Sequence, residues 1–364
     1  MTELSGKPGS SAATLPVEIV LHPSWWHKHT GMTFDEDFFF NPSRRVEAER
    51  AMESALYERW GEYGLGEHKD EDLPVVGPVH LAAGFIISEM LGCRVDYLEN
   101  APPQVICAEG NNIPSEFQLA FESPVFKKFQ RLLEALKTKY GYVVGDVNWG
   151  GILNVALDLW GQDILLGFYD NPEETDRRFQ GIAAVIQQFT DLVERETGST
   201  SISVNRNVLH FSQSLFLHSE CSLTMISAQD YERFLLSFDS AWSERRQSFG
   251  VHYCGCDPHR FAPSFAKIPQ LDFLDVGWGA DLTVLRTHLP DTFFNLRLSP
   301  VEFVTWEPAV VEQTVRSLVE QSGDPKLTGV CCINIDDRVR DDQIEALLST
   351  VRDLKRELPP AAED

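Results

Sequence analysis

Two histidines and two cysteines fall within eight residues of the segment FGVHYCGCDPHRF (249–261). His252 and Cys254 are two residues apart, a spacing that turns both side chains to the same face of a β-strand. An imidazole and a thiolate are ligands that zinc favours, but a catalytic zinc site needs three protein ligands and one open position. The segment therefore predicts part of a metal site, and a third ligand must come from elsewhere.

The third ligand is expected from the adjacent residues Cys331 and Cys332 in a later β-rich run. Neighbouring residues of a strand point to opposite faces, so only one of the two can face the site. One imidazole and two thiolates form a soft donor set that selects zinc. Cys256 is left out of this set. A redox pair of Cys254 and Cys256 is disfavoured, because the usual dithiol motif has two intervening residues and this one has a single glycine. The alternative is that these residues are simply buried.

Short β-rich runs that alternate with helical patterns must position these side chains. Capping signals mark two helix starts, one at Asn171 with Pro172 and one at Ser227 with Asp230. A third helix is predicted over residues 341–357, where the apolar residues lie on one face. Strands that alternate with helices indicate parallel pairing, and we predict an α/β fold, a (β/α)8 TIM barrel with an N-terminal extension. The β-rich runs are 142–148, 201–207, 249–255, 273–279, 293–299 and 329–335, with weaker candidates at 17–23 and 103–109.

The predicted barrel is a single domain over residues 15–357, in which the extension reaches to about residue 140 and covers one end. Residues 1–14 are rich in glycine, serine and alanine and are predicted to form a disordered tail. Residues 358–364 form a second predicted tail. No linker rich in proline, glycine and serine divides the interval between the two tails.

Composition limits the partners of the chain. Its 364 residues carry a formal net charge of -24, which repels phosphate backbones and anionic lipids, so we expect neither a nucleic acid nor a membrane as partner. We find no apolar run near 18 residues and no basic-then-apolar segment at the amino terminus, and we expect a soluble cytoplasmic protein. Seven cysteines are expected as reduced thiols that a metal can bind. A homodimer is a possible assembly.

The chain from about residue 142 to 357 resembles the uroporphyrinogen decarboxylase superfamily, and most of all its zinc-dependent, corrinoid-linked methyltransferase branch. HYC (252–254) and GVCC (329–332) stand where those enzymes carry a His-x-Cys and a later cysteine. The decarboxylases' arginine-bearing amino-terminal stretch has no match, and HPSWWHKHTGM (22–32) occupies that region. Further similar segments are LNVALDLWGQDILLGFYDNPEE (153–174), MISAQDYERFLLSF (225–238) and GWGADLTVLRTHLPDTFFNLRLSP (277–300).

The resemblance implies a methyltransferase in which zinc activates a substrate thiol or hydroxyl, and a methyl group passes to or from the cobalt of methylcobalamin. DPHRFA (257–262) departs from the cobalamin-binding pattern Asp-x-His-x-x-Gly at Ala262. The corrinoid is therefore expected on a separate protein, and the other substrate is a small molecule. The alternative is a metal-free lyase of the decarboxylase type, which acts on a carboxylated small molecule held by Arg206, Arg286 and Arg297.

Arg297 marks a departure from the family pattern. Arg297 and Ser299 stand where the family turn has an asparagine and an aspartate, so the rim of the site gains a cation. We expect Arg297 to bind an anionic group of the substrate, most simply a carboxylate, through its bidentate guanidinium. The alternative is a structural ion pair with Asp275 or Asp281.

Other polar and aromatic residues are candidates for catalysis or substrate binding. Glu220, with His218, could act as a general base or a labile metal ligand, or the two could lie in a surface loop. Paired tryptophans could form a cage for a methylated cation or seal one end of the barrel, and polar strand-end residues could bind substrate or cap a turn. The remaining substrate-binding candidates are Trp25, Trp26, His27, Asp146, Asn148, Arg206 and Trp278.

Overall fold

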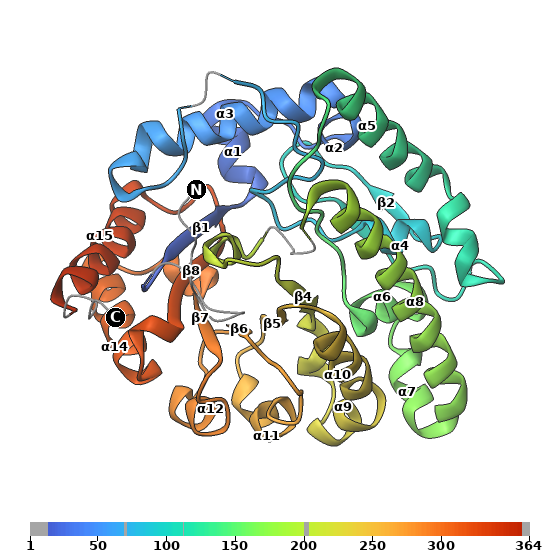
Figure 1. Ribbon diagram of the computed structural model, residues 1–364. Helices are drawn as coiled ribbons and strands as arrows, with labels where there is room; N and C mark the ends of the chain where they lie inside the picture. Colours follow the sequence, from blue (N-terminus) through green and yellow to red (C-terminus); the bar gives the residue numbers. More distant parts are fainter. Residues whose placement is uncertain (1–13, 69–70, 112, 200–203, 359–364) are drawn as a thin grey trace.

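The computed structural model describes residues 14–68, 71–111, 113–199 and 204–358, so residues 1–13 and 359–364 of the two predicted tails lie outside it. Six parallel strands form one curled sheet in the order β1-β8-β7-β6-β5-β4, which pairs the first strand with the last (Figure 1). The strands are β1 (Val17–Leu21), β4 (Phe216–Ser219), β5 (Phe249–Tyr253), β6 (Phe273–Val276), β7 (Phe293–Leu298) and β8 (Thr328–Ile335).

Helices cover the outer, convex side of the curled sheet and connect its parallel strands (Figure 1). Within the described ranges, no helix combines the length and the apolar character that crossing a membrane requires. The α-helices are α1 (Pro23–Thr30), α2 (Glu36–Phe40), α3 (Pro42–Trp60), α4 (Ile86–Met90), α5 (Pro124–Tyr140), α6 (Ile152–Trp160), α7 (Asp163–Asp170), α8 (Pro172–Thr197), α9 (Ala228–Phe234), α10 (Leu236–Arg245), α11 (Ala262–Phe265), α12 (Leu282–His288), α13 (Pro300–Phe303), α14 (Pro308–Ser322) and α15 (Asp341–Glu357). The 3-10 helices are η1 (Gly61–Tyr63), η2 (Phe117–Glu122), η3 (Arg206–His210), η4 (Cys221–Met225), η5 (Pro258–Phe261) and η6 (Pro325–Leu327).

The curled sheet confirms the predicted α/β class, and among the described residues it is a half-barrel of six strands and not a ring of eight. The run at 142–148 forms one parallel bridge, between Val75 and Val144. In the run at 201–207, residues 201–203 lie outside the described ranges, and η3 begins at Arg206. The run at 103–109 supplies β3 (Gln104–Ile106), which pairs with β2 (Arg94–Asp96) in a separate antiparallel sheet. The predicted runs that do contain strands of the curled sheet are 17–23, 249–255, 273–279, 293–299 and 329–335.

Helices α8 and α9 begin at the predicted signals. The side chain of Asn171 accepts a hydrogen bond from the Glu174 N–H at 3.3 Å, directly before α8. Ser227 and Asp230 form a reciprocal capping box at the start of α9. Such caps satisfy N–H groups that the first turn of a helix leaves without partners.

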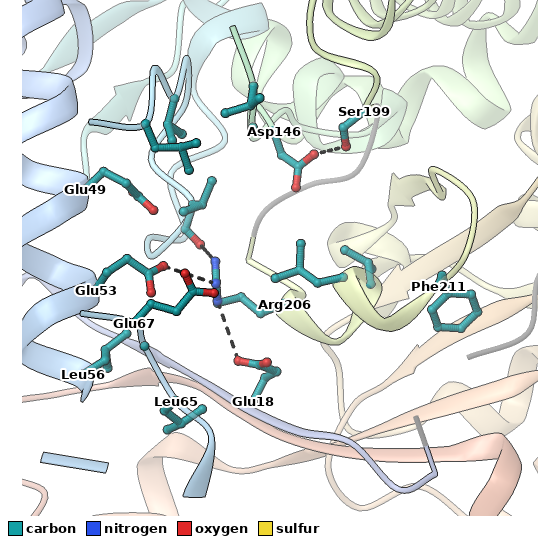
Figure 2. Close-up of a pocket in the computed structure, with 18 of the residues that line it drawn as sticks. Glu18, Glu49, Glu53, Leu56, Leu65, Glu67, Asp146, Ser199, Arg206 and Phe211 are labelled. Carbon is teal, nitrogen blue, oxygen red and sulfur yellow. Dashed lines mark hydrogen bonds and ion pairs between the residues drawn. The ribbon is translucent and has the colours of Figure 1, made fainter. Parts of the chain in front are cut away.

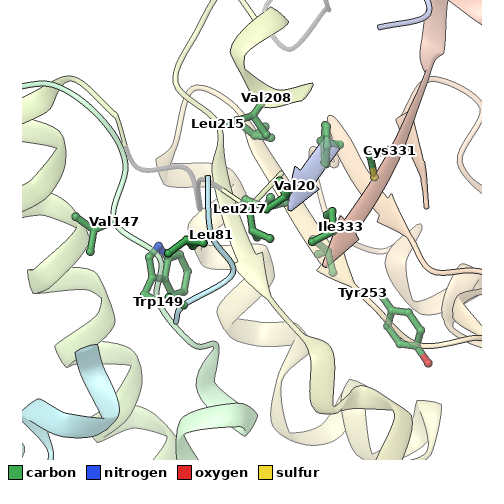
Figure 3. Packing of buried hydrophobic residues seen from close by; sticks show 14 of the residues in the cluster. Val20, Leu81, Val147, Trp149, Val208, Leu215, Leu217, Tyr253, Cys331 and Ile333 are labelled. Atoms are coloured by element: carbon green, nitrogen blue, oxygen red, sulfur yellow. The ribbon is translucent and has the colours of Figure 1, made fainter. Parts of the chain in front are cut away.

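Apolar side chains fill the interior of the half-barrel (Figure 3). Val20, Leu217 and Ile333 come from three strands of the sheet, and all are buried. Leu81 and Trp149, which belong to no strand, lie in the same cluster. The six strands do not enclose this core alone, and irregular segments supply part of its apolar surface. Burial of this surface favours folding.

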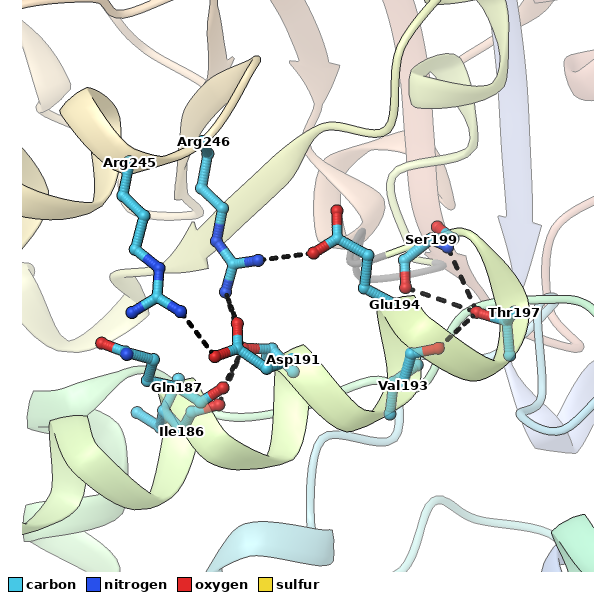
Figure 4. Close-up of polar contacts among 10 residues, drawn as sticks. Ile186, Gln187, Asp191, Val193, Glu194, Thr197, Ser199, Arg245 and Arg246 are labelled. Atoms are coloured by element: carbon cyan, nitrogen blue, oxygen red, sulfur yellow. Dashed lines mark hydrogen bonds and ion pairs between the residues drawn. The ribbon is translucent and has the colours of Figure 1, made fainter.

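Arg246, at the end of α10, joins this helix to α8 and to the first residue of β4. Its Nη1 donates to Glu194 at 2.6 Å, and its Nη2 donates to Asp191 at 2.7 Å and to Thr190 Oγ1 at 3.2 Å (Figure 4). Its guanidinium also lies 4.6 Å from the ring centroid of Phe216. The guanidinium of Arg246 has little access to water, so its charge depends on these contacts for stabilisation. The same contacts hold β4 in place against α8.

We expect Arg246→Met to lower the free energy of unfolding by about 2–3 kcal/mol, because it removes three hydrogen bonds and leaves Glu194 without its cation. The neighbouring Arg245 is half-exposed and, among the described residues, donates to Asp191 alone, so Arg245→Met is a matched control that should cost less than about 1 kcal/mol. Urea denaturation followed by circular dichroism measures both variants. Equal losses would show that Arg246 has no special role.

Candidate metal centre

The carboxyl ends of β4 and β5 bring one histidine and two cysteines together at one edge of the sheet, next to Asp275 on β6. The strand register pairs Ser219 with His252, and His252 with Asp275. Cys254 follows the last residue of β5, and Cys221 lies two residues beyond the end of β4. One ligand atom from each of Cys221, His252 and Cys254 lies within 4.8 Å of the other two. The structure thus assembles one imidazole and two thiols, the donor types that the sequence predicted.

The imidazole of His252 is held by the fully buried carboxylate of Asp275, which contacts Nδ1. Asn205 Nδ2 lies 3.2 Å from the same nitrogen, and Asn295 Nδ2 donates to Asp275 at 3.0 Å. Burial lowers the pKa of His252, but the Asp275 carboxylate and the hydrogen bond with Cys254 together outweigh burial and raise this pKa above its usual value. Because Asp275 occupies Nδ1, Nε2 is the nitrogen left to bind a metal.

The thiols of Cys221 and Cys254 share a hydrogen bond, which lowers the pKa of Cys254 and raises that of Cys221. Burial opposes the effect at Cys254, whereas His252 and Arg297 add to it. Cys254 is therefore the thiol that ionises more easily, and the thiolate is the form that binds metal.

Asn154 on α6 clamps the turn that carries Cys221. Its Nδ2 donates to the Ser219 carbonyl at 3.0 Å, and its Oδ1 accepts from the Ser222 N–H at 2.9 Å. The start of α6 can approach β4 this closely because residue 151 is glycine, where an added Cβ would lie 1.9 Å from the Ser219 oxygen. Close contact between α6 and β4 thus fixes the position of Cys221.

A cavity of about 280 Å³ opens beside the three donors, and Arg297 lines it. Arg297 is only 5% exposed, and its Nε and Nη1 have no hydrogen-bond partner among the described residues. Its ion pair with Asp275 is long, at 3.8 Å from Nη1 to Oδ2. A buried guanidinium with unused donors at a cavity is suited to an anionic ligand.

The structure places Cys221, and neither Cys331 nor Cys332, beside His252 and Cys254. Cys331 lies deeper along β8 among apolar side chains (Figure 3), where Asn295 Nδ2 donates to its Sγ at 3.3 Å. Burial, with a smaller effect of the nearby Asp275 carboxylate, raises the pKa of the Cys331 thiol well above its usual range. Cys332 is fully buried, and the alternation along a strand turns it to the opposite face of β8. The β8 residues that line the cavity are Ile333 and Asn334.

Cys221 is not among the ligands predicted from the sequence, because β4 (Phe216–Ser219) is not among the predicted β-rich runs. This strand has only four residues, two of which are polar, so its β-pattern is weak. The alternation from Leu217 through Ser219 would have placed Cys221 on the inner face of the sheet. That alternation is the signal that could have found it.

His218 and Glu220 face the helices on the other side of β4, fully buried, and do not line the cavity. His218 Nδ1 donates to Asp239 at 2.6 Å, and the Tyr231 hydroxyl donates to the same carboxylate at 2.5 Å. The Ile152 N–H donates to His218 Nε2 at 3.2 Å, which requires a neutral imidazole. The predicted catalytic pair thus belongs to a buried network between sheet and helices.

The tryptophans and histidine of α1 pack inside the N-terminal extension. Trp25 and Trp26 are fully buried, and the ring of Trp25 lies 5.7 Å from that of Trp60. His27 is half-buried, with its Nδ1 3.0 Å from the carbonyl oxygen of Met32. Because both indole rings are covered by protein, they offer no open face to a substrate.

Five predicted substrate-binding residues, Arg297 among them, line three cavities. Asn148 joins Arg297 in the cavity of about 280 Å³. Asp146 and Arg206 line a larger cavity of about 530 Å³, where Ser199 donates a hydrogen bond to Asp146 (Figure 2). Trp278 lines a third cavity of about 130 Å³ between β6, β7 and α14. Only Asn148 and Arg297 therefore share the cavity of the three metal donors.

Arg286, which the lyase alternative requires for a substrate carboxylate, is engaged with the protein itself. Its guanidinium donates to the carbonyl oxygens of Ser322, Thr292 and Leu327 at 2.9, 2.8 and 3.3 Å. It also lies 3.7 Å from the ring centroid of Phe294. Arg286 thus braces the segments before β7 and β8.

The pKa of Glu220 gives a test of its role. Burial raises this pKa from 4.5 to about 8, so between these pH values the folded chain keeps a proton that the unfolded chain releases. The contribution of Glu220 to the free energy of unfolding is therefore greatest below pH 4.5 and is lost as the pH rises through 8.

We expect Glu220→Gln to flatten the pH dependence of thermal unfolding, to be more stable than the wild type at high pH, and to keep its metal. Unfolding temperatures at pH 6 and pH 9, with metal analysis of both proteins, measure these effects. If Glu220→Gln lost its metal while the pH dependence stayed unchanged, Glu220 would be a ligand after all.

No family model and no curated protein sequence matches the chain. Among solved structures, a methyltransferase from Methanosarcina mazei is similar over 94% of each chain, with 13% identity and a TM-score of 0.58. A B12-independent methionine synthase from Shewanella sp. W3-18-1, in complex with selenomethionine, is similar over 96% of this chain and 99% of that chain, with 12% identity and a TM-score of 0.50. At this identity the comparison shows that the chain shares its overall fold with these two proteins.

Proposed function

We propose that the protein is a zinc-dependent methyltransferase whose metal is held by Cys221, His252 and Cys254. The observation that carries this proposal is the convergence of their three donor atoms within 4.8 Å at the carboxyl edge of a parallel sheet. Two thiols and an imidazole oriented by Asp275 fit zinc in donor type and number. The fold shared with a methyltransferase supports the reaction class.

Zinc bound by these residues supplies a Lewis acid that lowers the pKa of a substrate thiol or hydroxyl. Asp275 orients His252, and Asn154 fixes the turn that carries Cys221. The adjacent cavity of about 280 Å³ admits a small molecule beside the donors. The chain's own residues thus hold the metal and place the substrate next to it.

We propose in addition that Arg297 binds an anionic group of the substrate, most simply a carboxylate. Arg297 lines the same cavity as the three metal donors and has unused N–H groups. The alternative ion pair with Asp275 spans 3.8 Å and leaves these groups unpaired. Asp281 is engaged at the start of α12, where it accepts from the Val284 N–H at 3.0 Å.

The methyl group is exchanged, in this proposal, with a corrinoid carried by a separate protein. The segment DPHRFA (257–262) is occupied with internal contacts: Tyr253 donates to Asp257 at 2.5 Å, and His259 Nδ1 accepts from the Asp281 N–H at 3.1 Å. These side chains brace a loop, which supports a corrinoid partner rather than a corrinoid bound by this segment.

The metal-free lyase has less support. Arg286 is engaged with backbone carbonyls, and Arg206 pairs with Glu18 at 3.7 Å and with Glu53 at 3.8 Å. The three arginines that such a lyase would use for a carboxylated substrate do not meet at one cavity, because Arg206 lines the cavity of about 530 Å³ and Arg297 lines that of about 280 Å³.

Metal content tests the ligand set. The purified protein should contain about one zinc per chain, and Cys221→Ala and Cys254→Ala should each lose it, because two remaining ligands do not retain the ion. Cys331→Ala and Cys256→Ala are matched controls that should keep zinc. Plasma mass spectrometry after dialysis against a chelator measures all five proteins. Loss in Cys331→Ala with retention in Cys221→Ala would move the third ligand to β8, and a wild type without zinc would favour the lyase.

Substrate affinity tests Arg297. Arg297→Lys should weaken binding of a small mercapto-carboxylate to the zinc-loaded protein roughly tenfold to a hundredfold, because loss of one bidentate contact costs about 1.5–3 kcal/mol. Binding of an uncharged thiol of similar size is the control and should not change. Isothermal titration calorimetry measures both ligands. Normal carboxylate binding together with early thermal unfolding would make Arg297 a structural ion-pair residue.

A further inference from the structure

A second group of metal-binding side chains lies on the N-terminal extension, separate from the cysteine cluster. Glu49 and Glu53 are four residues apart on α3, a spacing that places both carboxylates on one face of the helix. His80 meets them from the segment between η1 and α4. One ligand atom from each of the three lies within 4.8 Å of the other two, and all three residues are buried.

The distances within this group match those of a coordination shell. His80 Nε2 lies 2.9 Å from Glu53 Oε1 and 3.5 Å from Glu49 Oε1. Metal–ligand bonds of about 2.1 Å set neighbouring ligand atoms about 3.0 Å apart in an octahedral shell and about 3.4 Å apart in a tetrahedral one. We propose that Glu49, Glu53 and His80 bind a divalent cation of the Mn²⁺ or Fe²⁺ class, at a site distinct from Cys221, His252 and Cys254.

Without a cation, the group leaves buried hydrogen-bonding capacity unused. His80 Nε2 carries at most one proton, which Glu53 accepts at 2.9 Å. Glu49 is only 3% exposed, and its Oε2 has no hydrogen-bond partner in the part of the chain that the structure describes. Burial of an unsatisfied carboxylate oxygen is unfavourable, and a bound cation would compensate for it.

Two arginines flank the group without filling its centre. Arg45 Nη2 lies 3.7 Å from Glu49 Oε2, and Arg206 Nη2 lies 3.8 Å from Glu53 Oε1. Both separations exceed a hydrogen bond, and Arg206 also pairs with Glu18 at 3.7 Å. The competing explanation is a purely structural ion-pair network, so a test must separate metal binding from stability.

The site opens onto the cavity of about 530 Å³, whose wall includes Glu49 and Glu53 (Figure 2). Glu18 and Glu67 line the same cavity, so its charge attracts a cation. The space leaves room for water molecules, which oxygen-preferring cations retain in their shell. Two carboxylates and one imidazole suit Mn²⁺ or Fe²⁺, whereas the two thiols of the other site select zinc.

Titration of the zinc-loaded, full-length protein with Mn²⁺, followed by electron paramagnetic resonance, tests the site. The wild type should bind about one Mn²⁺ per chain, with an unfolding temperature that rises with Mn²⁺ concentration. Glu49→Gln and His80→Ala should each weaken Mn²⁺ binding by at least about tenfold and keep their zinc. Glu67→Gln, which changes a carboxylate of the same cavity outside the group, is the matched control and should bind as the wild type does.

Two results would overturn the proposal. In the first, the wild type binds no Mn²⁺ at concentrations below about 1 mM, which is a lower affinity than ordinary protein sites have for divalent cations. This result would overturn the proposal whatever the stability of the variants. The other is equal Mn²⁺ affinity in the wild type, Glu49→Gln and His80→Ala. If His80→Ala fails to fold, Glu53→Gln replaces it under the same criteria. Either result would leave Glu49, Glu53 and His80 as an ion-pair network alone.

Discussion

The buried carboxylate of Asp275 is the interaction on which the candidate site depends. A charge removed from water is tolerated only when it is paired and hydrogen-bonded, and Asp275 finds partners in His252, Asn295 and the more distant Arg297. The same contacts turn the His252 ring so that Nε2 is available, and they keep Arg297 near the cavity. One desolvated charge on β6 therefore arranges both the nitrogen that would bind metal and the guanidinium that would bind an anion.

The parallel sheet brings the residues of the candidate site close together in space, although they are distant from one another in the sequence. Neighbouring strands in register bring Ser219, His252 and Asp275 side by side, and the turns just beyond the strand ends add the two thiols. Alternation along β4 separates adjacent residues by function. Cys221 joins the candidate metal donors, whereas Glu220 enters the helix layer, where burial raises its pKa to about 8.

The sequence predicted those parts of the fold that leave a local signal. The run at 273–279 became β6, and the signals at Asn171 and Ser227 became helix starts, because burial patterns and caps are encoded by neighbouring residues. The third donor is different, since it depends on strand register and on where each strand ends. Cys331 lies within a clear β-run, yet β8 continues two positions toward the cavity before Ile333 reaches it, and a weak four-residue strand delivers Cys221 instead.

X-ray absorption at the zinc edge of the wild-type protein, loaded with a single equivalent of zinc, tests the central claim most directly. We expect two sulfur ligands at about 2.3 Å with nitrogen or oxygen ligands at about 2.0–2.1 Å, and one sulfur fewer in Cys221→Ser. Three sulfur ligands in the wild type, or a shell of nitrogen and oxygen alone, would contradict a metal centre built from Cys221, His252 and Cys254.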